Sequence, residues 1–236
     1  MSNSNSKKPV VLTIAGHDPS GGACIQADIE SISHAGCYPV SIITALTTQN
    51  TSLVEEIIPQ TIGSFQKQLQ LILEDFDVRA CKLGIFASPE LIEIASQQLS
   101  DQAFPIVLDP IIRSGSGELF SNEDLCNTLM SHLFPLSTVI TPNSEEARQL
   151  SKQEALIDAA QILLNVGAKN VLITGTHEKT DKVINTLYTK DMSIYEYQWD
   201  RLTGEFHGSG CTLSSQIAAQ LALGHDIVDA IKTAQT

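Results

Sequence analysis

The chain has few basic residues and no long apolar run. Its 236 residues include 14 lysines and arginines against 27 aspartates and glutamates, which gives a formal charge of −13. Because no basic cluster is available to neutralise a row of phosphates, nucleic acid is not an expected partner. The apolar run from Val10 to Ala15 is too short for a signal-peptide core or a membrane span. The sequence therefore predicts a cytoplasmic protein that does not enter a membrane.

Cysteine is present but without a disulfide or metal pattern. The chain has five cysteines, an odd number, with no CxxC pair and no cluster with histidine at zinc spacing. The P-loop and dinucleotide motifs are missing as well: Gly22 stands where the P-loop lysine would be, and no GxGxxG occurs. These absences exclude the commonest nucleotide-binding signatures and a structural zinc site.

Apolar strands alternate with amphipathic helices along the whole chain. The pattern predicts strands at 10–15, 40–46, 80–85, 105–110, 137–141 and 170–174, and helices at 22–35, 61–74, 88–99, 121–134, 144–150, 153–166 and within 207–224. Residues 183–200 break this rhythm and predict an antiparallel hairpin at the sheet edge. The expected fold is one α/β domain over 1–236, with a mostly parallel sheet covered on both faces and a disordered polar segment at 1–8.

Polar or glycine-bearing segments follow the predicted strands. They read "AGHDPSGGA", "TTQNT", "KLGIF", "DPIIRSGSG", "TPNSEE" and "TGTH". Since ligands of open parallel sheets bind where strands end in loops, these segments predict a small-molecule site on one rim. Singly, each has a plain alternative: Asp18-Pro19 can be a turn former without function, and Gln49 can be solvated rather than reading the edge of a heterocycle.

The turn Gly208-Ser209-Gly210-Cys211 precedes the last predicted helix. Small residues would let an anion approach the free backbone N–H groups of a helix start, although they also make ordinary tight turns. A thiol in that position is expected to have a pKa below about 8.5 and to serve as a base or nucleophile. The alternative for Cys211 is a small packing residue.

Asn143 and Glu146 stand three residues apart at a strand-to-helix junction. Their oxygens could order water around Mg²⁺, or the two residues could form a capping box. Asp109 ends an apolar strand before Pro110 and is either a metal-facing carboxylate or a turn former.

Taken together, the motifs resemble a known family. "TIAGHDPSGGACIQADIESISHAG", "ITALTTQNT", "CKLGIF", "VLDPI", "ITPNSEEA" and "HGSGCTLSSQIAAQLALG" occur in the order and spacing of hydroxymethylpyrimidine/phosphomethylpyrimidine kinases. The resemblance implies a ribokinase-like three-layer α/β/α fold. It also implies phosphorylation, with ATP and Mg²⁺, of 4-amino-5-hydroxymethyl-2-methylpyrimidine and of its monophosphate in thiamin biosynthesis, and assembly as a homodimer.

The resemblance also implies roles for individual residues. Gly208, Ser209 and Gly210 match the anion hole of the family, and Cys211 matches a cysteine that stands where related sugar and pyridoxal kinases have an aspartate base. The positions that match substrate contacts are Ala23 (through its backbone), Asp28, Gln49 and Ile85. Asn143 and Glu146 match the pair near Mg²⁺, with Asp109 as the neighbouring carboxylate, and Asn143 and Thr174 are the predicted nucleotide contacts.

One departure concerns the nucleotide. Thr174 stands where the family commonly has a lysine, which should weaken ATP binding or move the charge requirement to Arg113 or Lys82. Two other functions remain open from the sequence: a pyridoxal-type vitamin kinase, and a non-catalytic protein that binds the pyrimidine.

Overall fold

The computed structural model describes residues 8–50, 53–112, 122–204 and 206–236. The disorder predicted for 1–8 falls almost wholly on residues 1–7, which lie outside this description, as does Arg113.

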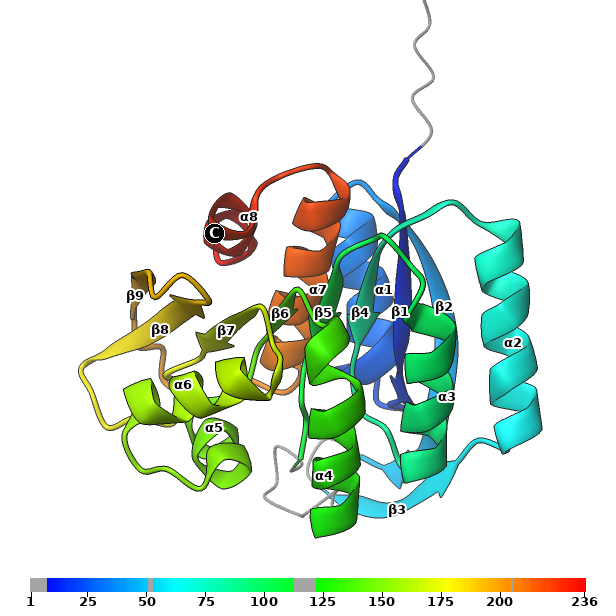
Figure 1. Ribbon diagram of the computed structural model, residues 1–236, viewed down its shortest axis with the longest axis horizontal. Coiled ribbons are helices and arrows are strands. Elements are labelled where there is room, and N and C mark those ends of the chain that lie inside the picture. Colours follow the sequence, from blue (N-terminus) through cyan, green and yellow to red (C-terminus); the bar gives the residue numbers. More distant parts are fainter. Residues whose placement is uncertain (1–7, 51–52, 113–121, 205) are drawn as a thin grey trace, which may run out of the picture.

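One sheet of nine strands runs through the described part of the protein (Figure 1). Its spatial order is β3-β2-β1-β4-β5-β6-β7-β8-β9, and the pairs from β2 to β7 are parallel. The strands are β1 (Val10–His17), β2 (Tyr38–Gln49), β3 (Val54–Pro59), β4 (Val78–Leu83), β5 (Ile106–Leu108), β6 (Val139–Ile140), β7 (Asn170–Ile173), β8 (Lys182–Thr189) and β9 (Ile194–Asp200). The predicted α/β class and the mostly parallel sheet are confirmed.

Helices cover both faces of the sheet. One face packs against α2 (Ile62–Asp75), α3 (Pro89–Leu99), α4 (Glu123–His132), α5 (Ser144–Ser151) and α6 (Leu156–Val166). The other face packs against α1 (Cys24–His34), α7 (Ser209–Ala222) and α8 (Ile227–Ala234). Because neighbouring strand residues point to opposite faces, Leu12 joins the first core and Val11 the second. This arrangement gives the three layers expected from the sequence.

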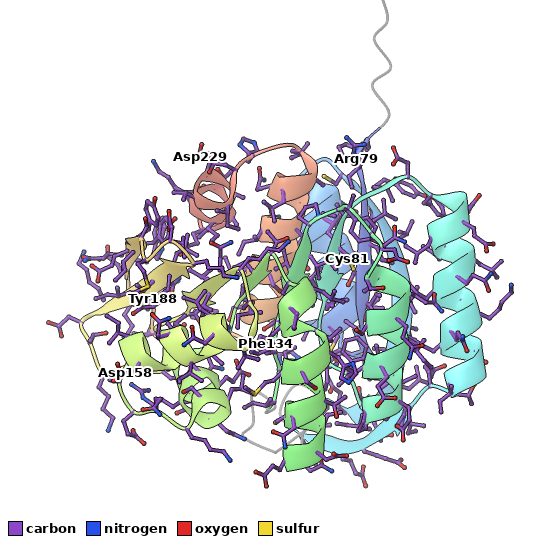
Figure 2. The ribbon with its side chains drawn as sticks, viewed as in Figure 1. Arg79, Cys81, Phe134, Asp158, Tyr188 and Asp229 are labelled. Atoms are coloured by element: carbon purple, nitrogen blue, oxygen red, sulfur yellow. The ribbon has the colours of Figure 1, made fainter. Side chains whose placement is uncertain are left out.

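Most of the interior is apolar, and many charged side chains lie at the surface. In Figure 2, Cys81 and Phe134 lie within the fold, where both are fully buried, whereas Asp158 and Asp229 lie at the surface. Across the described ranges, the helices are all too short or too polar to span a bilayer.

Both antiparallel additions to the sheet lie at its edges. The predicted hairpin is confirmed as β8 and β9, which pair from Lys182–Asp200 to Tyr188–Ile194. At the opposite edge, the expectation that "TTQNT" is a loop after the second strand was wrong for its first residues. Strand β2 continues to Gln49 because Ala45–Gln49 pairs antiparallel with β3. Helix α8, capped by Asp226, was also not predicted.

Candidate active site

The loop after β1 and the start of α7 meet in tight contact. A Cβ atom on Gly208 would lie 1.9 Å from the carbonyl oxygen of Gly22, and Gly208 has φ +81°, so both packing and backbone conformation require glycine there. The carboxylate of Asp18, in the same loop, lies 2.9 Å from Nε2 of His207. The structure therefore joins the "DPSGGA" loop to the "HGSGC" turn, two segments almost 190 residues apart in the chain.

Helix α7 begins at Ser209, with Gly208 as its N-cap. Ser209 donates its own N–H to the carbonyl of Phe206, at 3.3 Å. The N–H groups of Gly210 and Cys211 belong to the first turn, which has no carbonyl acceptor within its own helix. The exposed Gly210 leaves this turn open to an approaching anion.

Cys211 is buried beside Asp109. Its side chain helps to lower the pKa of the Asp109 carboxylate, and the residue is 6 % exposed. Burial raises the pKa of the thiol well above its ordinary value, although the charge of Lys82 opposes the shift. The expected lowering of the pKa by the helix start was therefore wrong, because desolvation outweighs the helix-terminal field.

Asp109 and Glu146 are both buried, and the charge of Asp109 acts on Glu146. Burial raises the pKa of Asp109 to about 6, and burial together with the Asp109 charge raises the pKa of Glu146 to about 8. Glu146 and Asn143 also form the capping box that the sequence offered as an alternative, with Glu146 Oε2 accepting from Asn143 N at 2.9 Å.

A buried acid whose pKa is raised by a neighbouring carboxylate, as that of Glu146 is by Asp109, suits a hard divalent cation that takes oxygen ligands. In the described residues, no group of three or more His, Cys, Asp or Glu side chains is placed to hold a metal. A cation here would therefore complete its ligand shell with water and substrate oxygens, as Mg²⁺ commonly does.

Asp28, a predicted substrate contact, has the hydrogen-bonding capacity of its side chain met by protein groups. It is fully buried, and its carboxylate accepts from Lys82 Nζ at 2.8 and 2.9 Å, from Ser215 Oγ at 2.7 Å and from Thr13 Oγ1. These donors occupy both oxygens, so we place Asp28 beneath the site. It links β1, α1, β4 and α7.

Lys82 is likewise fully buried. It therefore cannot replace the positive charge of the lysine that the family commonly has at the position of Thr174. Burial alone would lower its pKa, but the charges of Asp28 and Asp109 outweigh this and hold the pKa above its ordinary value. The glycine of the "KLG" motif leaves room for the ion pair between Lys82 and Asp28, because a Cβ on Gly84 would lie 2.8 Å from Lys82 Nζ.

The remaining predicted substrate residues lie around the β1 loop. Ala23 donates its N–H to Asp18 Oδ2 at 2.9 Å, so that donor is already engaged in the structure. Gln49 ends β2, is half-buried and contributes to lowering the pKa of the Asp18 carboxylate. Ile85 is buried against Gly16, where a Cβ would come within 2.8 Å of it, and its carbonyl accepts from Thr44 Oγ1 at 2.6 Å.

Thr174 and Asn143 come together through the backbone. They form an isolated parallel bridge, in which Thr174 N donates to Pro142 O and Ser144 N donates to Thr174 O, both at 3.0 Å. The two predicted nucleotide contacts are therefore adjacent, although neither brings a positive charge.

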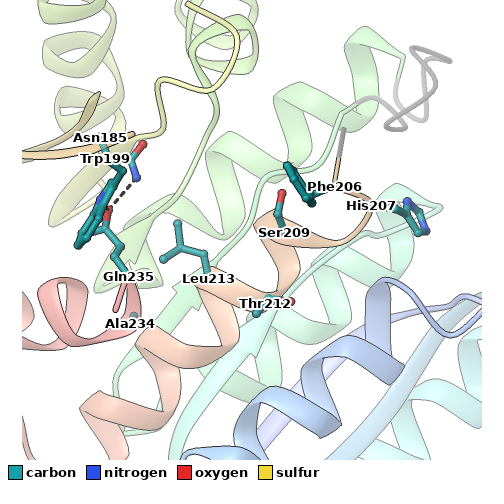
Figure 3. Close-up of a pocket in the computed structure, with 9 residues that line it drawn as sticks. All are labelled: Asn185, Trp199, Phe206, His207, Ser209, Thr212, Leu213, Ala234 and Gln235. Atoms are coloured by element: carbon teal, nitrogen blue, oxygen red, sulfur yellow. Dashed lines mark hydrogen bonds between the residues drawn. The ribbon is translucent and has the colours of Figure 1, made fainter. Parts of the chain in front are cut away.

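A pocket that the sequence did not reveal adjoins the α7 turn (Figure 3). It lies between β8, β9, the end of α8 and the first turns of α7, and its lining includes Asn185, Trp199, Phe206, Ser209, Thr212 and Gln235. Gln235 Oε1 accepts from Trp199 Nε1 at 3.0 Å and from Asn185 Nδ2 at 2.7 Å. No local pattern could find this group, because its members are 36 and 50 residues from Gln235 in the chain.

Comparison with known proteins decides the family. The family model for phosphomethylpyrimidine kinase matches residues 18–236. The chain belongs to the phosphomethylpyrimidine kinase family. A hydroxymethylpyrimidine/phosphomethylpyrimidine kinase of Aquifex aeolicus is 38 % identical over 233 residues, which cover 96 % of this chain and 91 % of that protein.

Solved structures give the same result for the fold. The phosphomethylpyrimidine kinase of Clostridium difficile 630 superposes with a TM-score of 0.84 at 34 % identity, covering 96 % of each chain. The ADP complex of Bacillus subtilis pyridoxal kinase gives a TM-score of 0.87 at 31 % identity and covers 97 % of this chain and 89 % of that one. The ribokinase-like architecture is thus shared by pyrimidine and pyridoxal kinases.

Proposed function

We propose that this protein, as a hydroxymethylpyrimidine/phosphomethylpyrimidine kinase, phosphorylates 4-amino-5-hydroxymethyl-2-methylpyrimidine and then its monophosphate. In the first step the alcohol oxygen bonds to the γ-phosphorus of ATP, the bond between that phosphorus and the β–γ bridging oxygen breaks, and ADP leaves. The hydroxyl proton passes to a base beside the alcohol. The observation that carries the proposal is the meeting of the "DPSGGA" loop with the N-terminal turn of α7.

The α7 turn is the proposed site for the transferring phosphoryl group. Positioning and charge stabilisation supply most of the acceleration in phosphoryl transfer, and the N–H groups of Gly210 and Cys211 provide both without a side-chain cation. Cys211, buried next to this turn, is the proposed proton acceptor. Because burial raises its pKa, Cys211 can accept this proton only as a thiolate, a form that a cation at Asp109 and Glu146 would favour.

Asp109 and Glu146 are the residues that would hold Mg²⁺. The charge of Asp109 opposes ionisation of the buried Glu146, and a divalent cation would relieve this effect. When bound, Mg²⁺ would neutralise charge on the nucleotide phosphates.

The pocket beside Trp199 is the proposed nucleotide site, since it borders the same α7 turn and a pyridoxal kinase of this fold binds ADP. We also propose a homodimer, which the family resemblance implies, and a cytoplasmic location, in keeping with five cysteines that form no disulfide in the described residues.

The decisive experiment is a product assay with purified full-length protein, ATP and Mg²⁺. Separate reactions receive the hydroxymethylpyrimidine, its monophosphate and pyridoxal, and phosphorylated products are separated by chromatography. We expect turnover of the first two. Tight pyrimidine binding without ADP formation would instead identify a non-catalytic binding protein.

Pyridoxal is the second candidate substrate. The observation that favours it is the close superposition on the pyridoxal kinase of Bacillus subtilis, with a TM-score of 0.87. Turnover of pyridoxal without turnover of either pyrimidine would replace the first proposal with this one.

A further inference from the structure

The pocket beside α7 has two ends of different chemistry (Figure 3). Ser209 and Thr212, on the first turns of α7, form one end, next to the proposed phosphoryl site. Phe206, whose carbonyl accepts from Ser209 N, lies at this same end. At the other end the ring of Trp199, on β9, lies beside Gln235, where α8 ends. A nucleotide whose phosphates reach the α7 turn would therefore direct its base toward Trp199.

The ring of Trp199 is held in one orientation. Its Nε1 donates to Gln235 Oε1 at 3.0 Å, and the same oxygen accepts from Asn185 Nδ2 at 2.7 Å. The amide nitrogen of Gln235 donates to the carbonyl of Ile231 at 3.0 Å. Because both ends of this amide are engaged, its oxygen stays directed at the indole. The indole N–H lies in the plane of the ring, so this hydrogen bond restrains the ring without covering either of its faces.

Asn185 extends this support to the segment after β7. The residue is 7 % exposed, and its Oδ1 accepts from Gly175 N at 3.0 Å. A Cβ on Gly175 would lie 2.2 Å from the carbonyl oxygen of Ile184, so this segment packs tightly against β8. Trp199 itself is only half-buried, and part of its ring therefore borders the pocket. The polar side chains thus hold an aromatic surface in place at the end of the pocket that lies away from the α7 turn.

We propose that Trp199 binds the nucleotide by stacking against its base, with Gln235 as the positioning residue that holds the indole. This inference rests on the proposed function. Every nucleobase presents a π-face, and aromatic side chains use that face to bind it. The phosphates are held separately, at the α7 turn. Loss of the ring should therefore weaken nucleotide binding but leave the chemistry of a bound nucleotide unchanged.

The chain has a single tryptophan, which allows a direct measurement on the wild-type protein. All tryptophan emission comes from Trp199, and a base stacked on an indole quenches that emission. The probe is ADP with Mg²⁺, added to the full-length protein, while isothermal titration calorimetry on the same sample gives the Kd. We expect the emission to fall with the same Kd. ADP binding without a change in emission would overturn the inference.

Two variants of Trp199 separate stacking from a structural role. Trp199→Phe keeps a π-face but loses the N–H that binds Gln235, whereas Trp199→Leu loses both. We expect the Kd for ADP to rise about tenfold in Trp199→Leu and less than about threefold in Trp199→Phe. In Trp199→Leu, kcat at saturating ATP should stay within about twofold of wild type. The matched control is Tyr195→Leu, an exposed residue on the same strand and outside the pocket, which should bind ADP as wild type does.

A purely structural role predicts a different result. Both variants lose the hydrogen bond to Gln235, so an equal rise in Kd for Trp199→Phe and Trp199→Leu would overturn the inference. If Trp199→Leu does not fold, the emission of the wild-type protein decides. ADP binding with quenching, but without phosphorylation of either pyrimidine, would contradict only the proposed function. Phosphorylation of the pyrimidine with an equal loss of ADP affinity in the two variants would contradict only the role of Trp199.

Discussion

Replacing Lys82 with methionine would leave the Asp28 carboxylate buried without its ammonium partner. Both side chains are fully buried, and Nζ contacts both carboxylate oxygens at 2.8 and 2.9 Å. Breaking such a pair from one side costs about 3–5 kcal/mol. Asp28 would keep the hydroxyl donors of Thr13 and Ser215, so we expect the lower end, about 3 kcal/mol.

Urea unfolding followed by far-UV circular dichroism measures this loss. With a slope of about 3 kcal/mol per molar urea, the Lys82→Met midpoint should fall by about 1 M. The matched variant is Lys82→Met with Asp28→Asn, which removes both charges, keeps an acceptor oxygen for one of the two hydroxyls and offers an amide N–H to the other. It should recover about 1–2 kcal/mol relative to Lys82→Met, as is usual for residues in direct contact.

The same variant tests the assignment of Lys82. Because Nζ is buried against Asp28, the KM for ATP of folded Lys82→Met should change less than about threefold. A destabilisation below about 1 kcal/mol together with a tenfold rise in that KM would refute the reasoning, since it would place the ammonium at the nucleotide instead.

Three further predictions concern the acids and the thiol. Cys211→Ala should lower kcat in the product assay by a factor of about 10² or more, because this is the usual effect of losing a positioned base. Near-normal turnover would show that Cys211 is only a packing residue. Glu146→Gln should raise the Mg²⁺ concentration for half-maximal activity by about tenfold, whereas Glu145→Gln, an exposed neighbour, should not. Hydrogen bonds from Arg148, at 2.7 and 3.0 Å, lower the pKa of Glu178 from 4.5 to about 2, so its stabilisation is present above pH 4.5 and disappears as the pH falls toward 2. Urea unfolding should therefore show Glu178→Gln less stable than wild type by about 1 kcal/mol at pH 7 and equal to it near pH 2, and a difference that does not depend on pH would contradict the assignment.

The spacing of apolar residues predicted those helices and strands whose pattern lies within their own segment of the sequence. The β8–β9 hairpin alternates polar and apolar residues on both sides of a tight turn, so its sequence alone shows the pairing. Strand β3 has no such signal, because "VEEIIP" carries adjacent acids and ends in proline. It exists because the end of β2 offers unpaired backbone groups, which a sequence pattern does not display.

Side-chain partners were harder to predict than elements. The sequence suggested a substrate contact for Asp28 and a nucleotide contact for Lys82, yet the two residues satisfy one another across 54 positions of the chain. Conversely, Asp18 was open to interpretation as a simple turn former before Pro19. His207, which contacts Asp18, lies in the turn before α7, and Gln49, which contributes to lowering the Asp18 pKa, lies at the end of β2. Only the folded arrangement therefore reveals which segments Asp18 connects.

Cys211 shows why a local rule can predict the wrong sign. A helix start favours the thiolate, and this effect acts on any cysteine in the first turn. Desolvation acts on the same group in the opposite direction and grows with burial, and Cys211 is 6 % exposed with a carboxylate beside it. The thiol therefore stays protonated unless a bound ligand or ion changes the charge around it. A nucleotide at the α7 turn adds negative charge, which disfavours a thiolate further, whereas a cation at Asp109 and Glu146 favours it. If Cys211 is the base, the pH at which kcat rises should accordingly fall as Mg²⁺ is raised, and an unchanged profile would assign the proton to another group.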